Sequence, residues 1–85
     1  MSVKLDIYID PACPGCDTAI NIARTVKEHM PQISVNLIDL TRSESHRPDA
    51  VFAVPTYLLN GKTMSLGNPD EAMLLSRLRE ALDHL

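Results

Sequence analysis

The chain has 85 residues, of which 45% are hydrophobic and 22% charged, and its formal net charge is −3. This size suits a single small domain with a compact core, so we expect one domain over residues 1–85. The slightly acidic balance gives no reason to expect nucleic acid or an anionic membrane as a partner. No stretch is long and apolar enough to span a bilayer.

The first predicted element is a strand over residues 3–9, where apolar and polar side chains alternate. A turn-forming DPA segment ends it, and a CPGC motif at residues 13–16 follows. Helical spacing of apolar residues then extends from Cys16 to residue 30, and Pro31 stops the helix. The only two cysteines of the chain therefore lie where a strand leads into a helix.

This position has a chemical consequence for the cysteines. A helix start carries partial positive charge and unpaired N–H groups, which stabilise the reactive thiolate. A Cys-x-x-Cys motif beside a βαβ pattern is typical of a dithiol that forms and exchanges a disulfide. Two alternatives stay open. Cys13 and Cys16 could bind copper or zinc, although His29, His46 and His84 are not at ligand spacing from one another. They could also be inert buried thiols.

The middle of the chain begins with a second alternating strand, over residues 33–39. A strand–helix–strand order predicts two parallel strands joined by a right-handed crossover. Residues 41–50 are polar, with a capping-box pattern from Thr41 to Glu44, so we expect a loop with a short helix within 44–53.

Two further strands are predicted over residues 56–59 and 62–66. Asn60-Gly61 between them is a strong signal for a two-residue hairpin, which makes these strands antiparallel and the sheet mixed.

The last predicted element is a helix that starts near residue 69. Asn68 is its expected N-cap, Pro69 fits the first helical position, and Asp70 and Glu71 suit the positive end. Its expected buried stripe is Ala72, Leu75, Leu78, Leu82 and Leu85. The predicted architecture is α/β, in the order β-α-β-α-β-β-α, with helices on both faces of a four-stranded mixed sheet.

This order, the CPGC motif and a Val54-Pro55 pair before the third strand together resemble the thioredoxin superfamily, with the size of glutaredoxin-like members. The resemblance implies a thioredoxin-like fold and a thiol–disulfide oxidoreductase that reduces protein disulfides and serves cell redox homeostasis. It implies that Cys13 attacks the substrate and that Cys16 resolves the mixed disulfide. It also implies a cis peptide bond before Pro55, which would lie beside the sulfurs.

The resemblance also indicates what the protein binds. The expected partners are disulfide-containing proteins and an upstream thiol reductant or reductase, with no bound cofactor. A cis bond would leave the N–H and C=O of Val54 facing outward, where an extended substrate chain could pair with them. The expected docking surface consists of Pro11, Ala12, Pro14, Val54, Pro55 and Gly67.

We expect a monomer in the cytoplasm. Lys4 and Asp6 interrupt the apolar residues of the N-terminus, which therefore does not resemble a signal peptide. A reducing compartment favours catalytic or metal-binding thiols over a static disulfide.

The chain departs from its best-known relatives at several positions. Thioredoxins carry a tryptophan before the first cysteine and a buried aspartate six residues before it, where this chain has Ala12 and Ile7. Glutaredoxins often carry a tyrosine at the position of Gly15 and a lysine nearby, which favour glutathione. The departures favour protein disulfides as substrate, and proton transfer at Cys16 through water or a peripheral group.

The charges around the motif predict a moderately activated nucleophile. The helix start lowers the pKa of Cys13, whereas the neighbouring carboxylates of Asp10 and Asp17 raise it. We predict a Cys13 pKa below that of free cysteine but not extremely low.

A further alternative to the redox function is a non-catalytic adaptor that keeps the fold and binds partners at the Val54-Pro55 edge.

Overall fold

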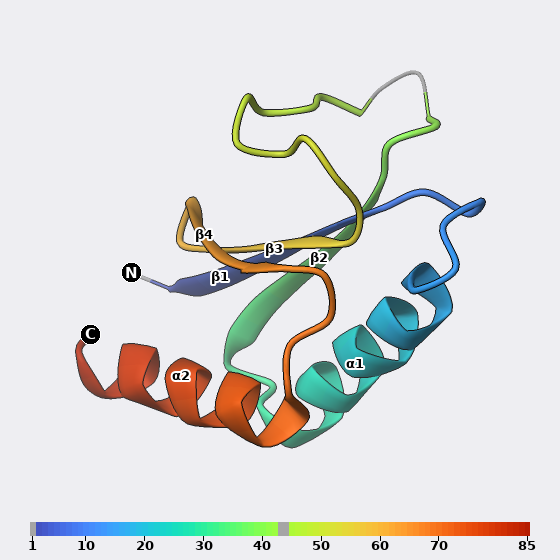
Figure 1. Cartoon of the computed structure of the whole chain (residues 1–85). Coiled ribbons are helices and arrows are strands. Elements are labelled where there is room, and N and C mark those ends of the chain that lie inside the picture. Colours follow the sequence, from blue (N-terminus) through green and yellow to red (C-terminus); the bar gives the residue numbers. More distant parts are fainter. Residues whose placement is uncertain (1, 43–44) are drawn as a thin grey trace.

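The computed structural model describes residues 2–42 and 45–85. It contains a four-stranded sheet with two helices packed on one face (Figure 1). In chain order the elements are β1 (Val3–Ile9), α1 (Cys16–His29), β2 (Ile33–Asp39), β3 (Thr56–Leu59), β4 (Lys62–Leu66) and α2 (Glu71–Asp83). The four predicted strands and the first and last predicted helices are confirmed. No helix in the described ranges is long and apolar enough to cross a membrane.

The strand order in the sheet is β2-β1-β3-β4. β1 and β2 are parallel and in register from Val3 opposite Ile33 to the ends of both strands. β3 is antiparallel to both β1 and β4, so the sheet is mixed, as predicted. Asn60 and Gly61 form the hairpin with φ angles of 51° and 85°, the left-handed values that this tight turn requires.

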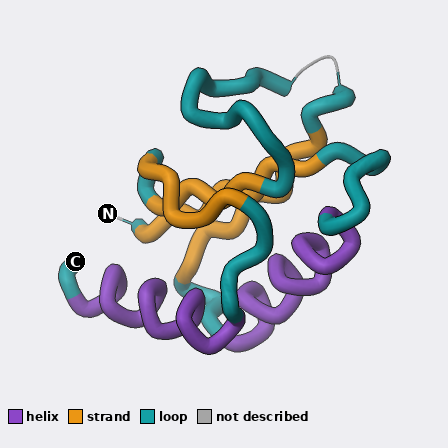
Figure 2. Tube along the Cα trace, in the orientation of Figure 1, coloured by secondary structure: helices purple, strands orange, loops and turns teal. Residues whose placement is uncertain are grey.

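The main core lies between the sheet and the two helices (Figure 2). Alternation along β1 points its apolar side chains toward α1, whose apolar residues recur at helical spacing. Tyr57 of β3 completes the cluster and is fully buried. The members of this cluster with no exposed surface are Val3, Leu5, Ile7, Ala19, Tyr57, Leu74 and Leu78.

The opposite face of the sheet corrects one prediction. Residues 45–53, between β2 and β3, cover part of it without forming a helix, and both helices lie on the other side (Figure 1). The prediction of helices on both faces is therefore wrong. No helix is present within residues 45–53, and residue 44 lies outside the described residues. The physical reason is that this segment buries one apolar side chain, Val51, against Tyr8 and Leu58, too few for an amphipathic helix.

The start of α2 differs from its prediction as well. Its N-cap is Asp70, whose side chain accepts a 3.0 Å hydrogen bond from the Met73 N–H, and not Asn68. The buried stripe is rotated accordingly. Leu74 and Leu78 are fully buried, Leu75, Ala81 and Leu82 are partly buried, and Ala72 and Leu85 are exposed.

Candidate redox site

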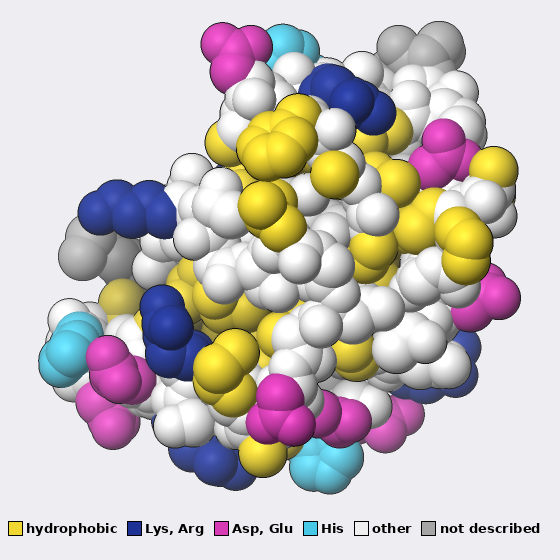
Figure 3. Space-filling model, in the orientation of Figure 1, with side chains coloured by type: hydrophobic (Ala, Val, Ile, Leu, Met, Phe, Trp, Pro, Cys, Tyr) yellow, Lys and Arg dark blue, Asp and Glu magenta, His cyan; other side chains and the backbone are white. Residues whose placement is uncertain are grey.

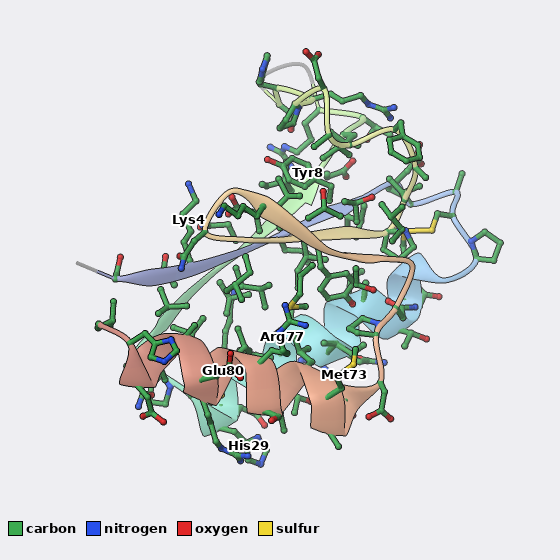
Figure 4. All side chains as sticks on the ribbon, turned by 60° about the vertical axis from the view of Figure 1, so that its left-hand side comes forward. Lys4, Tyr8, His29, Met73, Arg77 and Glu80 are labelled. Carbon is green, nitrogen blue, oxygen red and sulfur yellow. A yellow bond between two sulfur atoms is a disulfide. The ribbon has the colours of Figure 1, made fainter. Side chains whose placement is uncertain are left out.

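A disulfide joins Cys13 and Cys16 at the end of the sheet where β1 leads into α1 (Figure 4). The two Cα atoms are 5.4 Å apart. Cys16 is the first residue of α1 and only 2% exposed, whereas Cys13 is partly exposed at the rim of the core. The pair therefore sits at the positive end of the helix, with one sulfur-bearing residue nearer to solvent than the other.

The turn before the motif is organised by Asp10. Its carbonyl oxygen accepts a 2.9 Å hydrogen bond from the Cys13 N–H, and its carboxylate accepts another of 2.9 Å from the Ala12 N–H. Asp10 thus has the turn-forming contacts expected of an aspartate that ends a strand. Pro11 and Ala12 are exposed on the outside of this turn.

The Val54–Pro55 peptide bond is cis, as the resemblance implied. The Pro55 carbonyl oxygen accepts a 2.7 Å hydrogen bond from the Gly67 N–H, which joins the start of β3 to the end of β4. Pro55 is buried and Val54 is half-buried. The backbone of Val54 makes no hydrogen bond with any described residue.

Gly15 shows how close the motif lies to the proline. A Cβ placed on Gly15 would be 3.7 Å from the Pro55 Cδ, an ordinary van der Waals contact. The structure therefore brings the CPGC motif, Pro55 and Gly67 together, although they are far apart in the sequence. Pro14, next to Gly15, is exposed.

Sequence reasoning assigned Asn68 to a helix cap and missed that its side-chain amide donates a hydrogen bond to the Gly15 carbonyl. It also missed two exposed apolar side chains, Phe52 at 71% and Leu66 at 53% exposure. Phe52 precedes Pro55 by three residues and is the only phenylalanine in the chain. Figure 3 shows hydrophobic side chains gathered over the loop between β2 and β3 and the connection from β1 to α1.

Two buried side chains with polar groups, Tyr57 and Asp6, lie on opposite faces of the sheet. Burial raises the pKa of Tyr57, on the helix side, to about 12, so its phenol is neutral at physiological pH. Asp6 is buried on the other face, where it accepts a hydrogen bond from Asn36 and pairs with Lys4. Tyr8 also lies on that face (Figure 4). Asp6 therefore does not replace the buried aspartate of thioredoxins, because Cys16 belongs to the core between the sheet and the helices.

Comparison with known proteins identifies the family. Residues 2–79 match the family model described as thioredoxin domain. The chain belongs to this family. It is 27% identical to a thioredoxin of Methanocaldococcus jannaschii, over 94% of this chain and 96% of the relative. It is 28% identical to a probable thioredoxin of Methanothermobacter marburgensis, over 98% and 100%.

Solved structures support the same fold. A thioredoxin of Fasciola hepatica matches with a TM-score of 0.73 and 16% identity, covering 93% of this chain and 80% of that one. A malarial protein matches with a TM-score of 0.75 and 17% identity, covering 94% and 97%. The fold is therefore thioredoxin-like, with a four-stranded mixed sheet and two helices. The family match and the Cys13–Cys16 disulfide together support a thiol–disulfide oxidoreductase.

Among the residues that the structure describes, no three or more His, Cys, Asp or Glu side chains form a group that could hold a metal ion.

Proposed function

We propose that this protein reduces disulfides in partner proteins through the Cys13–Cys16 pair. The observation that carries the proposal is the disulfide at the start of α1, with Cys13 partly exposed and Cys16 buried. Cys13 is the residue that a partner's disulfide can approach. The helix start stabilises its thiolate, which is the nucleophilic form of cysteine.

The reaction passes two electrons from the dithiol to the partner. The Cys13 thiolate attacks one sulfur of the partner's disulfide, and the other sulfur leaves as a thiolate and takes up a proton. The Cys16 thiol loses its proton, and its thiolate attacks the Cys13 sulfur. The Cys13–Cys16 disulfide forms, and the second partner sulfur leaves as a thiolate. An upstream thiol reductant or reductase then returns the pair to the dithiol.

The partner's chain is proposed to dock beside the motif. The backbone of Val54, which has no hydrogen bond with the described residues, is available to pair with an extended segment. Two exposed apolar side chains are near this position along the chain or in the hairpin: Phe52 is two residues before Val54, and Leu66 of β4 pairs with Thr56, the first residue of β3. An extended segment with apolar side chains next to its cysteine fits these contacts.

We propose that the protein works as a monomer in the cytoplasm. A reducing compartment keeps the pair in the dithiol form that attacks a disulfide.

The direct test is reduction of insulin disulfides with dithiothreitol as the electron donor. Cys13→Ser should reduce turnover to the uncatalysed rate, whereas Cys16→Ser should accumulate a mixed disulfide with the substrate. Thr18→Ser, an exposed neighbour in α1, should keep the wild-type rate. Full turnover by Cys13→Ser would show that the proposed nucleophile is wrong.

Mass spectrometry of the intact purified protein separates this function from the alternatives. A redox pair should show a mass two hydrogens lower after oxidation and no bound metal. Copper or zinc retained with stoichiometric occupancy would favour a metal-handling protein that uses the same cysteines. A reversible pair without turnover in the insulin assay would favour a non-catalytic adaptor.

A further inference from the structure

The side chain of Asn68 connects the redox motif to the core. Its Nδ2 donates a 2.9 Å hydrogen bond to the carbonyl oxygen of Gly15, which lies between the two cysteines. Its Oδ1 accepts a 2.9 Å hydrogen bond from the Tyr57 hydroxyl. Figure 1 shows the segment between β4 and α2, which carries Asn68, running beside α1. Within residues 2–42 and 45–85, no other side chain outside the motif hydrogen-bonds to the motif's backbone.

The two hydrogen bonds determine the orientation of the amide. Tyr57 is fully buried and its phenol is neutral, so its hydroxyl can donate a proton to an acceptor. The amide oxygen of Asn68 is such an acceptor, and the amide nitrogen can only donate. The Gly15 carbonyl can only accept, so the amide nitrogen must face it, and the amide oxygen then accepts from the Tyr57 hydroxyl. Tyr57, a core residue of β3, thus holds the amide in this orientation.

Gly15 permits this contact because it has no side chain. A Cβ on Gly15 would lie 3.3 Å from the Asn68 Nδ2, so close that the Asn68 side chain would have to shift by a few tenths of an ångström. The same carbonyl oxygen accepts a 3.2 Å hydrogen bond from the Ala19 N–H in the first turn of α1. Asn68 therefore holds the peptide group that leads directly into Cys16.

We propose that Asn68 is a positioning residue that keeps the Cys13–Cys16 loop in its closed shape after the disulfide has been reduced. The inference rests on the proposed function. Reduction removes the covalent link that closes the loop, and the Asn68 bond to Gly15 remains. A loop held closed presents Cys16 to Cys13 at a higher effective concentration. Asn68 should thus speed the resolution of the mixed disulfide and favour the internal disulfide at equilibrium.

The test is the equilibrium of the pair with glutathione and the rate of mixed-disulfide resolution in Asn68→Ala. The bond is present in both redox states, so its loss lowers the equilibrium constant for the internal disulfide only as far as the dithiol loop opens in the variant. One hydrogen bond of ordinary strength limits this decrease to about tenfold, which corresponds to a reduction potential that is less negative by up to roughly 30 mV. The resolution rate, measured by stopped flow after a substrate disulfide is mixed with the dithiol, should fall by a similar factor.

Two further variants separate positioning from folding. Asn21→Ala, at an exposed asparagine of α1, should leave both readouts unchanged. Tyr57→Phe removes the hydroxyl that orients the amide and should shift both readouts in the same direction, but less. If Asn68→Ala does not fold, the equilibrium constant and the resolution rate are measured in Tyr57→Phe instead.

The outcomes also distinguish this inference from the proposed function. Wild-type values in Asn68→Ala, with a wild type that exchanges disulfides, would overturn the positioning role alone. A wild type that exchanges no disulfides would overturn the proposed function and this inference together. A lower melting temperature in Asn68→Ala with an unchanged potential would reduce Asn68 to a purely structural residue.

Discussion

The N–H of Gly67 donates a 2.7 Å hydrogen bond to the carbonyl oxygen of Pro55. This bond engages the carbonyl group of Pro55, the residue directly after the cis peptide bond. The residue before the cis bond, Val54, makes no backbone hydrogen bond with the described residues. The proposed pairing of an extended substrate chain therefore uses the backbone of Val54 and not that of Pro55.

Backbone pairing at Val54 predicts a specific sensitivity of the substrate. A disulfide peptide N-methylated at the nitrogen that faces the Val54 carbonyl should show a KM about twofold to tenfold higher, the value of one hydrogen bond. Scanning the methyl group over the residues next to the substrate's cysteine identifies that nitrogen. A peptide methylated far from its cysteine is the control. Pairing at Val54 is wrong if no position next to the cysteine differs from that control.

The acidity of Cys13 provides a second prediction. In Cys16→Ser, thiolate absorbance should give a Cys13 pKa below the value of about 8.5 for free cysteine, because the thiolate lies at the start of α1. Asp17→Asn should lower the pKa further, since an exposed carboxylate in the first turn of α1 repels the thiolate. Glu28→Gln, near the other end of α1, is the matched control. A Cys13 pKa of 8.5 or higher would contradict activation by the helix.

The cap of α2 provides a third prediction, on stability. Asp70→Ala removes the carboxylate that accepts the Met73 N–H and should lower the free energy of unfolding by about 1 kcal/mol. Asp83→Ala, at the last residue of α2, should change it by less than about 0.5 kcal/mol. Urea unfolding of the oxidised protein measures both. A loss below about 0.5 kcal/mol in Asp70→Ala would show that this carboxylate does not stabilise the start of α2.

Local sequence patterns were sufficient for most of the fold. Alternation along residues 3–9 places one set of side chains on the core face, and the structure has this arrangement in β1. Asn60 and Gly61 adopt positive φ angles that few other residue pairs allow, so these two residues were enough to locate the hairpin. The alternating pattern ends before the CPGC motif and the helical spacing begins at Cys16, so the sequence predicts that the motif lies between β1 and α1.

Contacts between distant segments could not be predicted in the same way. Asn68 has the local pattern of a helix cap, yet its partner Gly15 is 53 residues away, and Asp70 caps the helix instead. Nothing in the neighbourhood of Asn68 distinguishes these two uses of a polar side chain. The prediction of a helix in the segment with Val51 was wrong for a related reason. A capping pattern predicted a helix, but too little apolar surface follows to hold a helix on the sheet.

Titration of Tyr57 predicts how stability depends on alkaline pH. Burial raises its pKa from 10.0 to about 12, so the folded state holds this proton more strongly than the unfolded state. The resulting stability is fully present below pH 10 and is lost as pH rises from 10 toward 12. The loss should be on the order of 2 kcal/mol. Urea unfolding of the oxidised protein between pH 8 and about 11.5 measures it without interference from titrating thiols.

Two phenylalanine variants assign this effect to its residue. Tyr57→Phe should remove most of the decline in stability between pH 10 and 12, because phenylalanine has no proton to lose. It should also be less stable at neutral pH, since the hydrogen bond to Asn68 is lost. Tyr8→Phe is the matched comparison. Burial and the nearby Asp6 carboxylate also raise the pKa of Tyr8, but by less, so this variant should keep most of the decline. An unchanged alkaline slope in Tyr57→Phe would show that the buried phenol is not its source.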